Sequence, residues 1–305
     1  MHSNVSLEEL CALFGKSRQA YYKSKAYADS HQEWHGQILE YVRGQRKDQP
    51  RIGAEKLQGM LHAEASISIG RDALYDLLRS NGLLIKQRKK YRPPTTNGDG
   101  SSIYPDLRNQ ADPILAINKL WSTDITYLKL VENGKYCYAT FIVDEYSHLI
   151  VGYVVATDMT AIATIEALKM AVDKQGTAPE RKFNFELVFH SDRGGQFKSA
   201  LFQDFLSRHE IKCSMTKDGK PSENPVSERL NGIIKNELVG IDDFKNFEQA
   251  SQLIARAVHI YNTRRPHRSC NMLTPLQAHN YSGQPLKKLW KQRKIHRNGK
   301  SDIGF

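Results

Sequence analysis

The sequence has few of the features that mark secreted or membrane proteins. Its four cysteines are far apart and none forms a CxxC pair, which argues against a disulfide framework or a zinc knuckle and favours reduced thiols in a cytoplasmic protein. The first fifteen residues lack the basic start and apolar core of a signal peptide. The most apolar stretch, residues 136–156, is interrupted by Asp144, Glu145 and His148, so it predicts two strands and no membrane span.

Charge is the first positive signal. The 305 residues include 44 Lys and Arg against 33 Asp and Glu, a net charge of +11. A chain of this length forms two or three domains, and a basic balance of this size fits a polyanionic partner, most simply nucleic acid. The alternative is a basic enzyme whose charges are merely solvated.

The N-terminal residues 1–30 have the pattern of a helix-turn-helix. Ser6 is a good helix cap with Glu9 three residues later, and Gly15 separates this helix from a second one capped by Ser17. Arg18 and Gln19 lie near the start of the second helix, where such a motif contacts DNA. A plain helical hairpin would have the same pattern.

Residues 31–88 predict a second DNA-binding module of this kind. Three helices are expected, over about 31–47, 51–64 and 68–84, with Arg71 near the start of the third. His31 and His35 are one helical turn apart and suit zinc, but no cysteine pair follows at zinc-finger spacing, and two exposed histidines is the preferred interpretation.

Two basic segments flank the rest of the chain. Residues 89–114 form a basic and flexible linker, because the run KQRKKYR at 86–92 leads into PPTTNGDGSS. The tail, residues 286–305, holds seven Lys or Arg between 287 and 300. Both segments suit DNA phosphates; the alternatives are a solvated linker and a disordered tail.

Residues 115–285 predict an α/β core of the ribonuclease H-like type with a mixed five-stranded sheet. Three runs rich in β-branched and aromatic residues, separated by short turns, suggest antiparallel strands over 120–130, 135–144 and 148–156. Helical patterns then alternate with two further strands, FELVFHSD and IKCSMT. Short turns followed by helical crossovers fit a mixed sheet.

Three carboxylates of this core stand out by position. Asp124 lies inside the first strand, where β propensity disfavours an acid; Asp192 ends the fourth strand, before a glycine turn; Glu228 lies on the helix after Asn224 and Pro225. Asp144 and Asp158 also flank strands and compete for the role of the first acid. Asp124 is preferred because it is mid-strand, whereas Asp144 is expected to end its strand structurally.

The spacing on that helix gathers polar groups on one stripe. Glu228, Asn231 and Lys235 follow an i, i+3, i+7 pattern, so a carboxylate and a lysine are available for metal and phosphate; an ordinary surface Glu and Lys is the alternative. Phosphodiester cleavage suits two Mg²⁺ ions about 4 Å apart, and Mg²⁺ takes carboxylate oxygens. Three acids from different elements would make such a site.

The motifs WSTDITYL, HSDRGGQF and SENPVSERLNGIIKNE closely resemble the DDE transposases of bacterial insertion sequences, of the OrfB type with a retroviral-integrase-like core. Thirty-five residues separate Asp192 from Glu228, the family's characteristic spacing, and YNTRRPHRSCNMLTPLQA at 261–278 is similar to its closing signature. The pattern before the acid is Glu223-Asn224-Pro225, where the family often has Asp-Asn-Ala.

The resemblance implies DNA strand transfer. Asp124, Asp192 and Glu228 would hold two Mg²⁺ or Mn²⁺ ions, and a freed 3′-hydroxyl would attack another phosphodiester directly, without a covalent protein–DNA intermediate. Lys235, Asn231 and His190 match positions expected near the DNA. The implied partners are double-stranded DNA, further copies of the chain assembled on it, and an upstream OrfA product, separate or fused; no membrane is expected, and the protein would be cytoplasmic and nucleoid-associated.

Two other functions fit the residues less well than a transposase. A DNA-binding regulator with an inactive core would keep the helical modules but lack an acid, and all three acids are present. A simple ribonuclease H-like nuclease would lack the N-terminal modules and this motif order.

Overall fold

The computed structural model describes residues 6–85, 104–108, 114–175, 187–218, 223–241, 243–281 and 286. The chain divides into two compact units, Met1–Lys90 and Tyr91–Phe305. Most of the predicted linker and nearly all of the basic tail lie outside the described residues.

The first unit begins with helix α1 (Leu7–Leu13), a turn, and helix α2 (Arg18–Asp48). Ser6 and Glu9 form the predicted capping box on α1, and Ser17 caps α2 through a 3.1 Å bond from the Ala20 N–H. The prediction of separate helices before and after residue 30 is wrong, because α2 is continuous for 31 residues. The domain boundary expected at 30/31 falls inside it; no glycine or proline interrupts residues 18–35.

The second half of α2 belongs to a three-helix core. Helices α3 (Ala54–Ala65) and α4 (Arg71–Ser80) follow it, and their apolar faces meet Ile38 and Val42. The two predicted helices over 51–64 and 68–84 therefore exist, with Arg71 as the first residue of α4. Residues 66–70 join them, a short turn of the kind found in helix-turn-helix motifs.

The second unit is built on a mixed sheet with the order β3-β2-β1-β4-β5. Strands β1, β2 and β3 are antiparallel neighbours, and β4 and β5 are parallel to β1 and to each other. The bounds are β1 (Leu120–Leu130), β2 (Tyr136–Asp144), β3 (Ile150–Ala156), β4 (Val188–Ser191) and β5 (Lys212–Met215). This confirms the ribonuclease H-like fold.

A short sixth strand extends the predicted five. β6 (Asp243–Phe244) pairs in parallel with Lys129 and Leu130 at the far end of β1. Two residues are too few to give an alternating pattern in the sequence, which is why this strand was not predicted.

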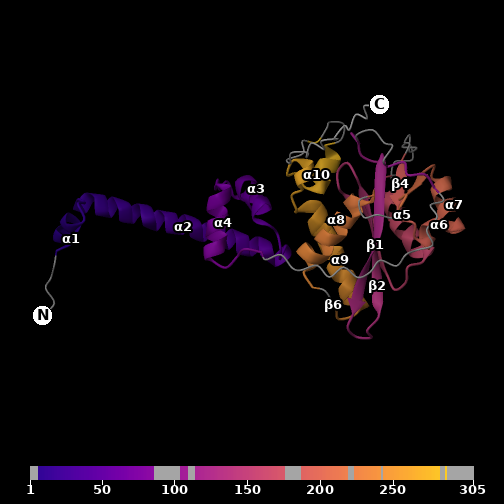
Figure 1. Cartoon of the computed structure of the whole chain (residues 1–305), viewed down its shortest axis with the longest axis horizontal. Coiled ribbons are helices and arrows are strands. Elements are labelled where there is room, and N and C mark those ends of the chain that lie inside the picture. The colour runs from indigo at the N-terminus through magenta and orange to yellow at the C-terminus, as the bar shows by residue number, and fades with distance from the viewer. Residues whose placement is uncertain are drawn as a thin grey trace, which may run out of the picture. The chain divides into compact units, whose positions relative to one another are not determined.

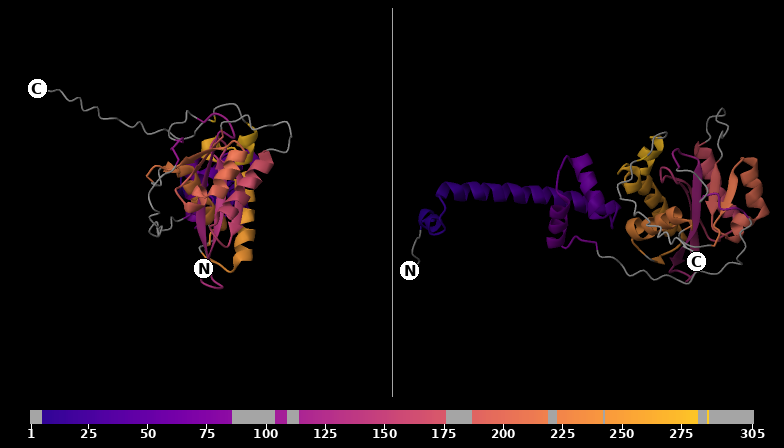
Figure 2. Two further views of the ribbon diagram at one scale, coloured as in Figure 1. Left: turned by 90° about the vertical axis from the view of Figure 1, so that its right-hand side faces the viewer. Right: turned by 45° about the horizontal axis from the view of Figure 1, so that its top comes forward.

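Helices cover both faces of the sheet, as Figures 1 and 2 show. One core, around Trp121 and Phe189, lies under the helices α5 (Ala161–Gln175), α6 (Gly195–Lys198) and α7 (Ala200–Arg208). The other, around Leu128 and Phe141, lies under α8 (Pro225–Ile233), the π-helical turn η2 (Ile234–Val239) and α9 (Phe247–Thr263). The chain continues through η3 (Arg268–Cys270) and α10 (Pro275–Asn280).

The described residues bear on two expectations, the lack of a membrane span and the lack of disulfides. Within them, no helix combines the length and apolar character that crossing a bilayer requires. All four cysteines are free thiols, and Cys11, Cys137 and Cys270 are buried.

One glycine allows the close packing of α5 on the sheet. A Cβ built on Gly152 of β3 would lie 2.1 Å from the carbonyl oxygen of Ala167, and backbone has little freedom to give way.

Gly152→Ala should therefore lower the free energy of unfolding by about 1–3 kcal/mol, measured by urea denaturation of the full chain. Gly232→Ala is the matched control, because the nearest atom to its Cβ would be 3.9 Å away and alanine favours the helix. Equal stability of the two variants would contradict this account of the α5 contact.

Candidate active site

The pairing of β1 with β4 brings two of the predicted acids together. The strands are parallel, and Ser122 pairs with His190. Asp124 and Asp192 each lie two residues further along, so they occupy matching positions on the same side of adjacent strands. Both side chains are partly buried.

Helix α8 is tied to β1 at this point. The Asn224 side-chain amide donates to the Thr123 carbonyl oxygen at 2.7 Å, and the Asn231 amide donates to Asp124 Oδ2 at 2.8 Å. Glu228 lies between these two anchors on α8, with its side chain exposed. Asn224 is the N-cap residue of α8, but its side chain makes no capping hydrogen bond, because its amide is used on the neighbouring strand.

The charges of the other two acids act on the carboxyl group of Asp124. Burial, first, and the charges of Asp192 and Glu228 raise the pKa of Asp124 to about 7, against the opposing hydrogen bonds from the Ile125 N–H and Asn231. Burial also raises the pKa of Asp192, while a 2.9 Å bond from the Gly194 N–H opposes that shift. Such shifts are typical of sites where acids are held together for a cation or for proton transfer.

Lys235 lies on η2 near the same strand. Its Nζ donates to the Tyr127 carbonyl oxygen at 2.8 Å, three residues beyond Asp124. Two ion pairs hold the turn η2 in place. Glu237 of η2 pairs with Arg265, whose side chain is only 1% exposed, and with Arg229 at 2.9 Å. The positions of the acids and Lys235 were predictable from motif spacing. The Glu237–Arg265 pair was missed: Arg265 lies in the closing signature at 261–278, but that motif does not indicate a partner 28 residues earlier.

The structure does not support the predicted DNA contact by His190. Its ring is fully buried and lies 2.9 Å from Ser214 Oγ and 3.2 Å from the Glu223 carbonyl oxygen. His190 lies on β4 two residues before Asp192, and its ring is covered by β5 and by the backbone before α8. It links β4, β5 and the start of α8.

The competing acids Asp144 and Asp158 are held by local hydrogen bonds. Asp144 is fully buried and accepts bonds from the Asn118 N–H and from the Ser147 N–H and hydroxyl, at 2.7–2.8 Å. Asp158 accepts bonds from Thr160 before α5. Both have local structural partners, as expected for Asp144 from the sequence.

The remaining predicted DNA contacts belong to the helical unit. Arg18 and Gln19 are exposed on the first turn of α2, and Arg18 lies 5.8 Å from the centre of the Tyr22 ring. Arg71 is exposed and pairs with Asp72. His31 and His35 have ring centres 4.2 Å apart on α2, and neither belongs to a cluster of three metal-ligand residues in the described part of the chain.

Comparison with known proteins agrees with this geometry. Residues 116–221 and 209–275 match two profiles described as integrase core domain. The chain is 30% identical over 269 residues to the uncharacterized 31 kDa protein of insertion element IS600 from Shigella sonnei, which covers 87% of this chain and 96% of that protein. The chain belongs to the DDE transposases of insertion sequences.

The chain is also similar to a named transposase and to a viral integrase core. The transposase InsF of insertion sequence IS3fB from Escherichia coli K12 is 30% identical over 204 residues, 67% of this transposase and 68% of InsF. Among solved structures, the HTLV-2 integrase catalytic core in complex with magnesium is 24% identical with a TM-score of 0.42, over 54% of this chain and 98% of that one. By its family, the protein is a polynucleotidyl transferase.

The raised pKa of Asp124 predicts how stability depends on pH. The folded, metal-free protein binds this proton more tightly than the unfolded chain, whose Asp has a pKa near ~3.9. The free energy of unfolding should therefore fall as pH rises from about 4 to about 7. Asp124→Asn should remove this loss and be more stable than the parent at about pH 8, on the order of 2 kcal/mol, by urea denaturation in chelator.

Asp158→Asn is the control, because hydrogen bonds to Thr160 lower the pKa of that exposed acid and its removal should bring no gain. An Asp124→Asn variant that is less stable than the parent at about pH 8 would contradict the electrostatic description of the site.

Proposed function

We propose that Asp124, Asp192 and Glu228 hold the divalent ions with which this transposase cleaves and joins DNA. The observation that carries the proposal is the carboxyl of Asp124, whose pKa is raised to about 7 by burial and by the two other acids. Three hard oxygen donors from a strand, a strand end and a helix suit Mg²⁺, with Mn²⁺ as a substitute. A cation removes the repulsion that otherwise favours protonation.

Two ions about 4 Å apart fit the chemistry of the family. When bound, they supply a Lewis acid for the attacking and leaving oxygens. Water first attacks the phosphodiester at the element end, a P–O bond breaks, and a 3′-hydroxyl is released. That hydroxyl then loses its proton and attacks a second phosphodiester, whose 3′-oxygen leaves as the new P–O bond forms.

The residues around the acids have positioning roles in this proposal. Asn231 fixes one oxygen of Asp124, and the Gly194 N–H fixes one oxygen of Asp192, so these two residues would orient the carboxylates that hold the ions. This role replaces the direct DNA contact first expected for Asn231. Lys235 on η2 contacts β1 three residues beyond Asp124 and is the residue proposed to meet a DNA phosphate there.

Recognition of the element ends is assigned to the helical unit. Exposed Arg18, Gln19 and Arg71 lie at helix starts, where side chains reach the major groove in helix-turn-helix proteins. Because strand transfer joins two DNA ends, the active form is proposed to be a homo-oligomer on DNA. An upstream OrfA product, separate or fused, is the proposed further partner.

Neutral substitutions of each acid test the site. Asp124→Asn, Asp192→Asn and Glu228→Gln should each lower Mg²⁺-dependent cleavage of a duplex carrying the element's own terminal sequence by about 10³-fold or more, the cost of several kcal/mol of lost metal ligation. Binding of the same duplex, measured by fluorescence anisotropy, should remain. The readout is gel analysis of nicked and joined strands.

Asp158→Asn is again the matched control and should cleave like the parent. Parental activity in Glu228→Gln would refute the metal site, and so would full activity of the parent in chelator without any divalent ion.

The proposed end-binding residues make a second prediction. Arg71→Ala should weaken binding to the terminal duplex and lower the slope of log affinity against log salt by about 1 if Arg71 meets a phosphate. Lys56→Ala, on α3 of the same unit, is the control for a general loss of charge. An equal loss in both variants would contradict a specific role for Arg71.

A further inference from the structure

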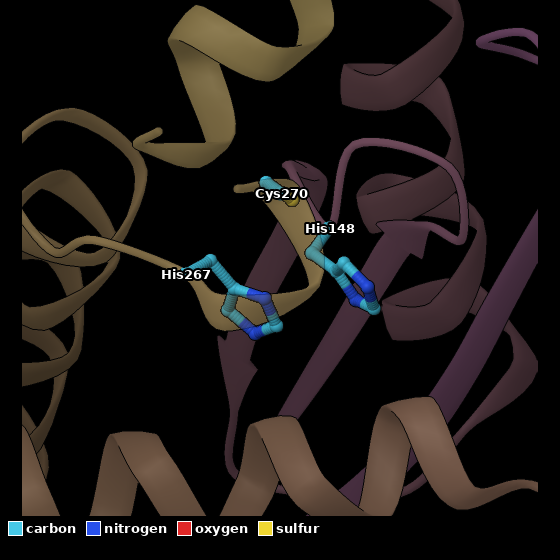
Figure 3. Close-up of side chains that lie close together, drawn as sticks. All are labelled: His148, His267 and Cys270. Atoms are coloured by element: carbon cyan, nitrogen blue, oxygen red, sulfur yellow. The ribbon is translucent and has the colours of Figure 1, made fainter. Parts of the chain in front are cut away.

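Three metal-ligand side chains meet at a place that the acids do not use. His148 lies in the turn between β2 and β3, while His267 and Cys270 lie in the segment that follows α9 (Figure 3). One ligand atom of each residue lies within 4.8 Å of those of the other two. The histidines are partly buried and Cys270 is buried.

We propose that His148, His267 and Cys270 form a second metal site, which takes Zn²⁺ and clamps the segment after α9 to the β2–β3 turn. Nothing in the strand-transfer chemistry requires these residues, and none of them belongs to the carboxylate group. The proposal therefore stands whether or not the acids bind Mg²⁺.

The donor set suits zinc and not magnesium. Two imidazole nitrogens and a thiolate are soft or borderline ligands, and Zn²⁺ binds them at about 2.0–2.3 Å in tetrahedral geometry. Around a zinc ion the three ligand atoms would lie closer together than the 4.8 Å within which they now lie. Rotation of the side chains would bring them to those positions. Water fills the fourth position.

The backbone on both sides is already held in place. In one segment, the His267 N–H donates to the Leu273 carbonyl at 2.9 Å and the Cys270 N–H donates to the His267 carbonyl at 3.0 Å, which closes a tight loop. In the turn, the His148 N–H donates to the Asp144 carbonyl at 2.8 Å. A prepared frame of this kind reduces the entropy cost of collecting ligands.

Two local contacts change when the ion binds. The rings of His148 and His267 are stacked, with centres 4.3 Å apart and planes at 22°, and at least one must turn a nitrogen toward the ion. The Cys270 thiol donates to the Ser147 carbonyl at 3.3 Å. Its S–H bond breaks as the sulfur–zinc bond forms, and the proton passes to solvent.

The location gives the clamp a consequence for the transposase. His267 is two residues after Arg265, the buried partner of Glu237 on η2, and η2 also carries Lys235. A zinc ion that fixes His267 to the β2–β3 turn therefore stabilises the segment from which Arg265 reaches the π-helical turn.

Cobalt is the probe for the test. The full-length chain, stripped of metal and kept reduced, is titrated with Co²⁺, whose thiolate charge-transfer absorption appears only when sulfur is a ligand. The parent should show this band at one ion per chain, and one equivalent of Zn²⁺ should abolish it and raise the melting temperature. Cys270→Ser should lose the band, and His148→Gln should bind Co²⁺ at least about 10-fold more weakly.

Three controls separate this site from others. Cys213→Ser removes a thiol from β5 and should keep the band, as should Glu228→Gln, which disables the proposed Mg²⁺ site. His31→Gln with His35→Gln removes the histidine pair on α2 and should also keep it. Circular dichroism confirms that each variant is folded. Absence of the band from the parent, or its persistence in folded Cys270→Ser, would overturn the proposal.

Discussion

Burial of two carboxylates on neighbouring parallel strands, with the repulsion between them added, is the constraint around which the core is organised. The pairing of Ser122 with His190 sets Asp124 beside Asp192, and hydrophobic layers on both faces of the sheet prevent the strands from separating to relieve it. The cost appears in the pKa of Asp124, raised to about 7. In the proposed metal site a cation would remove this unfavourable charge, which would make metal binding and stability two expressions of one interaction.

Helix α8 depends on polar anchors that reach from far along the chain. Asn224 and Asn231 fasten it to β1, and Glu237 fastens the following π-helical turn to buried Arg265. π-Turns occur often at functional sites, and this one presents Lys235 beside the strand that carries Asp124. The segment after α9 thus holds, through Arg265, the turn that carries Lys235, and the proposed zinc clamp would fix that segment in turn.

Much of this could be predicted from the sequence where a pattern was local. Alternation along 120–156 predicted the three strands β1, β2 and β3, and the Asp–35–Glu spacing singled out Asp192 and Glu228 as the acids of the proposed site. Three features that were not predicted from the sequence depend on contacts between residues far apart in the chain. The side chain of Asn224 has its partner 101 residues away, the ring of His190 is buried by neighbouring strands, and His148 meets Cys270 only through the fold. The continuity of α2, in contrast, was visible in the local sequence, because residues 18–35 contain no glycine or proline. The expected boundary between two helical modules at residue 30 hid it.

The most direct measurement is the structure of the full transposase crystallised with Mn²⁺, with anomalous scattering used to locate the ions. The account predicts anomalous peaks between the carboxylates of Asp124, Asp192 and Glu228, two when DNA is bound and about 4 Å apart. Peaks at Asp144 or Asp158, or well-occupied Mn²⁺ elsewhere with these three carboxylates empty, would contradict it.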